Sequence, residues 1–269
     1  MRRWILILGL CLAAQLSLAQ EPYPFQNGET LTLSIMYKWG AINTEVGTAL
    51  LQIDSLRSDG ARTYNLSCHA WTAPFFDRFY KIRENLQSWV RVKDLRPLRF
   101  FRDTYEGGYV ATNDFHYNWE EGQIEADVNF ENKGPQRLLI PLKEGEYDLI
   151  SLLYHLRRLD ESAYQDGAIT KVRFAIDDNV FDVYIRASGQ ENIKIRKKGR
   201  INAWHLSCSV VQGALFDGDE DLHLWLSADG NRIPVAAKVP LKVGAVQAWI
   251  TGWNGLKNPF DAWTDERKR

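Results

Sequence analysis

The stretch from residue 78 to residue 102 interleaves aromatic side chains with eight basic and two acidic ones. A guanidinium group beside an exposed ring can hold an anionic amphiphile or a glycan through charge-assisted hydrogen bonds and stacking. If the candidate residues form a single binding site, at least three of them should converge on one concavity, because residues of neighbouring strands meet only on a shared face. Alternatively, the basic side chains protect strand edges from pairing with another chain. The candidate ligand-binding residues are Tyr80, Arg83, Trp89, Arg102 and Tyr105.

Catalytic motifs are absent from the chain. There is no HExxH, GxSxG, Walker loop, GxGxxG or paired CxxC. The five histidines are scattered over different expected elements, and the acidic run Asp217, Asp219 and Asp221 matches only the opening of a calcium loop. We therefore predict no catalytic residue, no metal ligand set and no cofactor, and we expect a binding protein rather than an enzyme.

Two cysteines, Cys68 and Cys208, lie in similar contexts, YNLSCHA and WHLSCSV. Alternation along a strand would turn both toward the core. One interpretation is a disulfide between distant strands, which requires Cα atoms within about 7 Å. The other is a pair of small buried hydrophobic residues, since free cysteine is commonly buried.

Residues 1–19 have the three parts of a secretory signal peptide. A charged start is followed by an apolar run from Trp4 to Leu12 and by small residues before Gln20. Cys11 lies inside the apolar run and follows Leu10, where a lipidation signal needs a small residue. We expect a periplasmic or envelope-associated protein that is not lipidated. No later apolar stretch approaches 18 residues, so no transmembrane segment is expected after cleavage.

The charge balance gives no support for binding nucleic acid. The chain has 33 basic and 34 acidic residues, and losing Arg2 and Arg3 with the signal leaves 31 against 34, a net charge of −3. A general nucleic-acid binder would instead carry a strongly basic surface.

Strand-like alternation dominates the chain from Thr30 onward. In Thr30–Tyr37, leucine, isoleucine and tyrosine occupy one face while threonine and serine occupy the other, as in a half-buried antiparallel strand. Similar segments recur, often separated by turn residues such as Gly107-Gly108. Short connections of this kind favour hairpins over parallel βαβ units.

One segment, Asp148–Leu159, has helical spacing of its leucines instead. Asp148 suits the N-cap, because its carboxylate can accept from free amides of the first turn. We therefore predict a mainly β fold: a strongly curved antiparallel sheet or open barrel with one principal helix, with a β-sandwich as the alternative. The expected organisation is a signal peptide (1–19), one β-rich domain (20–255) and a polar C-terminal tail (256–269).

Four blocks carry a resemblance to a known family, from about Tyr23 to Gly252. Because of these four blocks and their order along the chain, the sequence resembles an exported bacterial family, domain of unknown function thirty-one-oh-eight, in its Bacteroidetes-type version. The resemblance implies no activity and no catalytic residues. The blocks are YPFQNGETLTLSIMYKWGAINTEVGTALL, PFFDRFYKIRENLQSWVRVKDLRPLRFFRDTYEGGY, YDLISLLYHLRRL and LHLWLSADGNRIPVAAKVPLKVGAVQAWITG.

Three functions are compatible with these features. The first is non-enzymatic binding of an apolar or amphiphilic envelope ligand, such as a lipid, on the concave face of the sheet. The second is a glycan-binding or glycan-active protein that uses surface aromatic residues. The third is a structural partner within a cell-envelope assembly. Fold analogy alone does not distinguish them.

Overall fold

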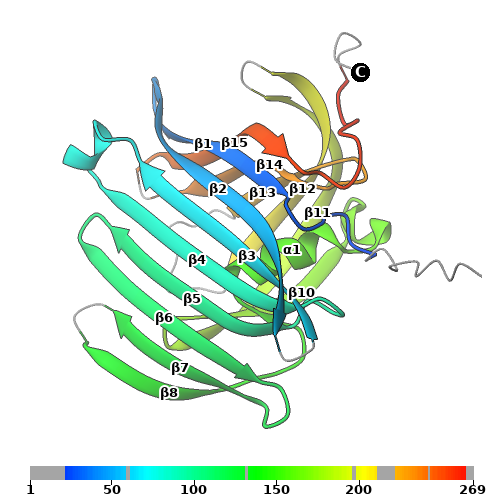
Figure 1. The fold of residues 1–269 in the computed structure, drawn as a ribbon. Coiled ribbons are helices and arrows are strands. Elements are labelled where there is room, and N and C mark those ends of the chain that lie inside the picture. Colours follow the sequence, from blue (N-terminus) through cyan, green and yellow to red (C-terminus); the bar gives the residue numbers. More distant parts are fainter. Residues whose placement is uncertain are drawn as a thin grey trace, which may run out of the picture.

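The protein is described by a computed structural model in which a single sheet curls around one α-helix (Figure 1). The expected signal peptide and the acidic run 217–221 lie outside the described residues. The described residues are 22–58, 61–130, 133–195, 198–210, 222–241 and 243–264.

Fifteen strands form the sheet in these described residues. Successive strands are antiparallel neighbours from β1 to β8 and from β10 to β15, and β1 also pairs with β15, which joins the two halves. All neighbours are antiparallel except β9 and β10. The strands are β1 (Thr30–Trp39), β2 (Ile42–Ser58), β3 (Ala61–Thr72), β4 (Ile82–Arg91), β5 (Pro97–Glu106), β6 (Tyr109–Asn118), β7 (Gln123–Phe130), β8 (Pro135–Pro141), β9 (Glu146–Tyr147), β10 (Ile169–Ile176), β11 (Asn179–Ile195), β12 (Gly199–Val210), β13 (Leu222–Ser227), β14 (Pro234–Pro240) and β15 (Ala245–Asn254).

The sheet is strongly curved but open. Its two edge strands, β8 and β9, do not pair with each other in the described residues, so the barrel is not closed. The predicted curved antiparallel sheet with one principal helix is therefore confirmed, and the sandwich alternative is not observed. We call the face toward the helix concave and the other face convex (Figure 1).

Helix α1 (Leu149–Arg157) starts at the predicted cap. Asp148 Oδ1 accepts from the amides of Ile150 and Ser151 at 2.9 Å each, and its Oδ2 accepts from Ser88 Oγ at 2.6 Å. Tyr154 joins Ile150 in a hydrophobic cluster with residues of β2 to β8. The cap thus fixes the helix to β4, and the apolar face of the helix fills the concave side of the sheet.

A buried ion pair connects the far end of the helix to the start of β1. Arg157 donates to both carboxylate oxygens of Glu29, at 2.6 and 2.9 Å, and to the carbonyl of Asn231 at 3.0 Å. Both charged side chains are fully buried. The Arg157 guanidinium also lies 5.0 Å from the ring centroids of Phe25 and Tyr154. Such a group is retained in an interior only when it is paired and hydrogen-bonded.

Residues 256–264, the described part of the expected C-terminal tail, run along the sheet. Trp263 forms a β-bridge with Ile201, and Thr264 N donates to the Arg200 carbonyl at 3.0 Å. The Trp263 ring also contacts Phe260, at 5.3 Å between centroids. This segment packs against the sheet because it supplies large apolar rings among its polar residues.

No disulfide joins Cys68 and Cys208. Cys68 packs between the clusters of the N-terminal half and of the strands around β1, whereas Cys208 belongs to the cluster of the C-terminal half. The interpretation as two small apolar residues therefore fits this structure. Burial raises the pKa of the Cys68 thiol to about 12, with a further contribution from Glu84, so this thiol stays protonated and unreactive near neutral pH.

Candidate functional site

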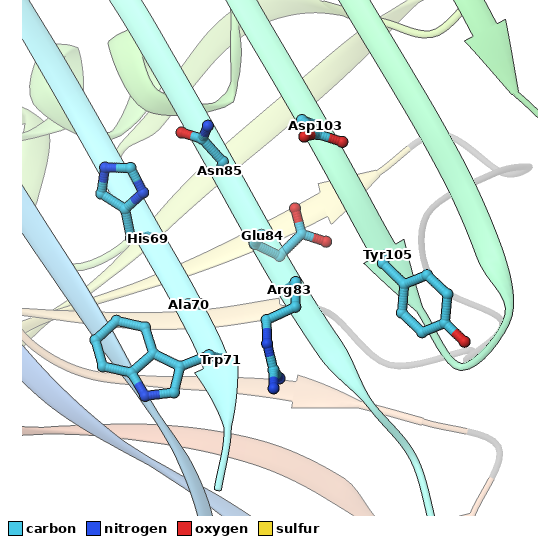
Figure 2. A pocket seen from close by; sticks show the side chains of 8 residues that line it. All are labelled: His69, Ala70, Trp71, Arg83, Glu84, Asn85, Asp103 and Tyr105. Atoms are coloured by element: carbon cyan, nitrogen blue, oxygen red, sulfur yellow. The ribbon is translucent and has the colours of Figure 1, made fainter. Parts of the chain in front are cut away.

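A shallow depression of about 490 Å³ lies on the convex face across β3, β4 and β5 (Figure 2). Two cross-strand rows build it. The first row pairs Trp71 with Arg83 and Arg83 with Tyr105, and the second places His69, Asn85 and Asp103 side by side. Figure 2 shows the Trp71 and Tyr105 rings on either side of Arg83. The depression therefore combines two partly exposed rings with a cation, a carboxylate, an amide and an imidazole.

Arg83 is held in place by the loop that precedes β4. Its guanidinium donates to both oxygens of Asp77, at 2.9 and 2.5 Å, and Thr72 Oγ1 donates to the same carboxylate at 2.5 Å. These hydrogen bonds, from Arg83 first, lower the pKa of Asp77 to about 2. Asp77 is therefore ionised at any physiological pH, and Arg83 is oriented rather than freely mobile.

The loop before β4 exposes several rings beside this depression. Its short 3₁₀ turn η1 (Phe76–Arg78) is flanked by Phe75 and Phe79, whose side chains are 63% and 75% exposed. The Tyr80 ring covers the β5–β6 turn at Gly107, where a Cβ atom would lie 2.1 Å from the ring. Gly107 also has a φ of +57°, so glycine suits this position on two grounds.

Large exposed apolar side chains gather at one end of the sheet. Of fourteen in the described part of the chain, ten lie at or near the hairpins that join β1 to β2, β3 to β4, β5 to β6 and β14 to β15, on the left in Figure 1. Single exposed apolar residues are ordinary on a protein surface, so the concentration of ten of them at one end distinguishes this end from the rest of the described surface. We name it the aromatic end: Trp39, Ile42, Trp71, Phe75, Phe79, Tyr80, Tyr105, Val110, Leu241 and Val243.

Arg102 lies on the opposite, concave face from Arg83. It is buried, donates to Thr104 Oγ1 at 2.9 Å and pairs with Asp177 of the β10–β11 turn at 3.0 Å. Thr104 in turn donates to Glu84 Oε2 at 2.6 Å. Burial raises the pKa of Glu84, and the Thr104 hydrogen bond and the Arg102 charge oppose that rise. The network ties the β10–β11 turn to β5, which is a structural role.

The five predicted residues do not form one site. Only Arg83 and Tyr105 share the depression. Trp89 lies six positions further along β4 under the guanidinium of Arg99, at 5.0 Å, and Tyr80 lies in the neighbouring loop. The three-residue spacing between Arg102 and Tyr105 already implies opposite faces of a regular strand. Trp71, His69, Asn85 and Asp103 were missed, because the register between strands is not readable from one sequence.

The described residues contain no group of three or more histidine, cysteine, aspartate or glutamate side chains placed to hold a metal ion. Among the helices of this same part of the chain, none has the length and apolar character needed to cross a membrane.

The fold defines a β-barrel-like class of protein, and in this chain the single curved sheet is open and encloses a helix. A solved structure of this class, the β-barrel-like protein of domain of unknown function DUF1849 from Brucella abortus, superposes with a TM-score of 0.55 at 9% identity. The match covers 87% of this chain and 100% of that one, and at this identity it shows the fold alone. No curated protein matches this chain. The family DUF3108, described as a protein of unknown function, matches residues 34–251, and the chain belongs to it.

Proposed function

We propose that this protein is an exported, non-enzymatic binding protein that holds an anionic amphiphile of the cell envelope at its aromatic end. The observation that carries the proposal is the gathering there of ten of the fourteen exposed large apolar side chains of the described residues. The exposed side chains of Arg78 and Lys81 lie in the loop before β4, next in sequence to its exposed aromatic residues Phe79 and Tyr80. Rings and cations together suit the boundary between apolar chains and charged headgroups.

The concave face supports this function less well. Three hydrophobic clusters pack on this sheet, and residues of α1 contribute to each of them. Buried charged groups of the concave side pair with one another, as Arg102 does with Asp177 and Arg157 with Glu29. A ligand at the aromatic end needs no rearrangement of this core.

Binding to vesicles tests the proposal. The double variant F75S/F79S should bind vesicles containing phosphatidylglycerol roughly tenfold or more weakly than the unmodified protein, because two apolar anchors are lost. The variant R78Q/K81Q should lose the preference for anionic over neutral vesicles. Flotation with each vesicle type measures both effects.

The matched control is L139S/I169S, which removes two exposed apolar side chains away from the aromatic end. This variant should bind vesicles as the unmodified protein does. Equal binding by F75S/F79S and the unmodified protein, with both folded by circular dichroism, would exclude the aromatic end as the binding surface.

Export rests on residues 1–19, and cleavage should leave a mature chain that begins near Gln20. Intact-mass measurement of protein from the periplasmic or envelope fraction of its native cells tests this. Recovery of the uncleaved chain from the cytoplasm would contradict export.

A glycan ligand is the second candidate, favoured by the depression in Figure 2. Trp71 and Tyr105 could stack on sugar rings while Asn85 and Asp103 accept or donate hydrogen bonds to hydroxyl groups. A glycan array with the unmodified protein and with W71A/Y105A distinguishes the candidates. Binding to a glycan that is lost in the variant supports the glycan ligand. Binding to no glycan, together with binding to vesicles, supports the amphiphile.

A further inference from the structure

Two histidines that are distant in sequence meet on the convex face of the C-terminal half. His205 on β12 and His223 on β13 alternate with the buried Leu206 and Leu224, so both imidazoles point away from the core. Nε2 of His205 lies 2.9 Å from Nδ1 of His223. Eighteen residues separate them, and only the β12–β13 register brings the two rings together.

A carboxylate orients the first ring. Glu191 Oε1 lies 3.3 Å from Nδ1 of His205 and also accepts a hydrogen bond from Trp225 Nε1. The Trp225 ring stacks on His205 at 4.7 Å between centroids, with only 8° between the planes. With its proton on Nδ1, beside Glu191, His205 accepts a hydrogen bond at Nε2 from Nδ1 of His223. A metal ion that binds both nitrogens would take the place of this proton, and His223 would carry its proton on Nε2 instead.

This arrangement matches part of a metal centre. Histidine ligands usually donate their other ring N–H to a carboxylate, which fixes the tautomer and increases ligand basicity. For metal–nitrogen distances of about 2.05 Å, a separation of 2.9 Å between the nitrogens corresponds to an angle at the metal of roughly 90°. Two adjacent positions of a tetragonal or octahedral ion have this angle.

We propose that His205 and His223 bind one divalent transition-metal ion, with water completing its coordination and Glu191 acting as a positioning residue. Imidazole nitrogen suits Cu²⁺, Ni²⁺ and Zn²⁺ rather than Mg²⁺ or Ca²⁺. The His205 side chain is 18% exposed and that of Glu191 is 45% exposed, so an ion can reach the pair from solvent.

Nearby charge limits the affinity without removing the site. Lys238 on β14 pairs in register with His223, and its ammonium group opposes a cation there. The variant K238Q should therefore bind metal more tightly. Glu191 supplies the compensating negative charge beside His205.

The test uses the protein purified without a histidine tag and stripped with a chelator. Isothermal titration with CuCl₂ should show one tight equivalent, that is, one tightly bound Cu²⁺ ion per protein chain. The electron paramagnetic resonance spectrum of this copper complex should report two nitrogen ligands. H205Q and H223Q should each weaken this equivalent at least tenfold, and E191Q should weaken it roughly tenfold. Zinc titration should follow the same order at lower affinity.

Trp225 supplies an independent readout, because a bound Cu²⁺ ion would lie close to its ring and quench its fluorescence. W225F should keep the bound equivalent but lose that part of the quenching. The matched controls H69Q and H116Q, on the N-terminal half of the sheet, should leave the equivalent unchanged.

Imidazole NMR of the unmodified protein avoids any effect of the substitutions on folding. Stoichiometric Cu²⁺ should broaden the ring signals of His205 and His223 before those of the other three histidines. Three results would overturn the proposal. They are the absence of a tightly bound Cu²⁺ ion, tight binding that persists in both H205Q and H223Q, and equal broadening of all five histidine rings.

Discussion

At the residue scale, His155 shows how burial near a cation controls protonation. Its ring stacks on Tyr147 at 4.4 Å, and Nδ1 lies 2.9 Å from the Tyr147 hydroxyl. Burial, and then the charge of Arg158, lowers the pKa of His155 to about 4. The folded protein therefore holds a neutral ring that the unfolded chain would protonate below its ordinary value of 6.5.

This difference predicts a pH dependence of stability. As the pH falls from about 6.5 to about 4, the unfolded chain takes up a proton that the folded chain refuses, so the free energy of unfolding decreases. The loss is at most about 3 kcal/mol and stays constant below the folded pKa. Urea unfolding at pH 7 and pH 5 should show a smaller difference for H155Q than for the unmodified protein.

The exposed His116, on β6, provides the control. H116Q should retain the full pH dependence. An identical dependence for H155Q and the unmodified protein would show that His155 is not the group responsible.

At the scale of elements, the stability of α1 depends on its N-cap residue, Asp148, more than on its length. The helix has only nine residues, too few for stability in isolation. The carboxylate of Asp148 satisfies two amides of the first turn and the hydroxyl of buried Ser88. Burial raises the pKa of Asp148, and these hydrogen bonds oppose the rise.

Replacing this carboxylate should loosen the helix from the sheet. D148A should lower the free energy of unfolding by about 2 to 4 kcal/mol, the sum of a lost cap and a buried hydroxyl left without its acceptor. Chemical denaturation measures the change. The double variant D148A/S88A should cost little more than D148A, because the unsatisfied hydroxyl is then gone; fully additive costs would argue against the shared hydrogen bond.

At the scale of the whole molecule, the buried pair of Glu29 and Arg157 joins three distant parts of the chain. It connects the start of β1, the end of α1 and the turn at Asn231. E29Q should lower the free energy of unfolding by roughly 3 to 5 kcal/mol, because it leaves a buried guanidinium without a counter-charge. Thermal and urea unfolding measure this loss.

The comparison pair is Arg137 with Glu125, whose side chains are 70% and 39% exposed. E125Q should cost less than about 1 kcal/mol, since solvent screens an exposed pair. The apolar double variant E29L/R157M should recover much of the stability lost in E29Q. Equal small costs for E29Q and E125Q would contradict the role assigned to the buried pair.

The sequence by itself determined the strand period, the helix and its cap, and the family. These follow from local properties: alternation predicts a two-sided strand, and β1 at Thr30–Trp39 begins at the predicted residue. Asp148 caps α1 as predicted, because its bonds reach only two and three residues along the chain. The edge strand β8 escaped prediction because prolines stand at both of its ends.

Tertiary structure alone decided which side chains meet. Arg83 lies beside Tyr105 and Trp71 because of the register of three strands, and His205 reaches His223 for the same reason. The packing of Trp263 on Ile201 depends on contacts across sixty-two residues. A single sequence carries the period of each strand but not the offset between strands, and a one-residue change of that offset would rebuild every cross-strand pair.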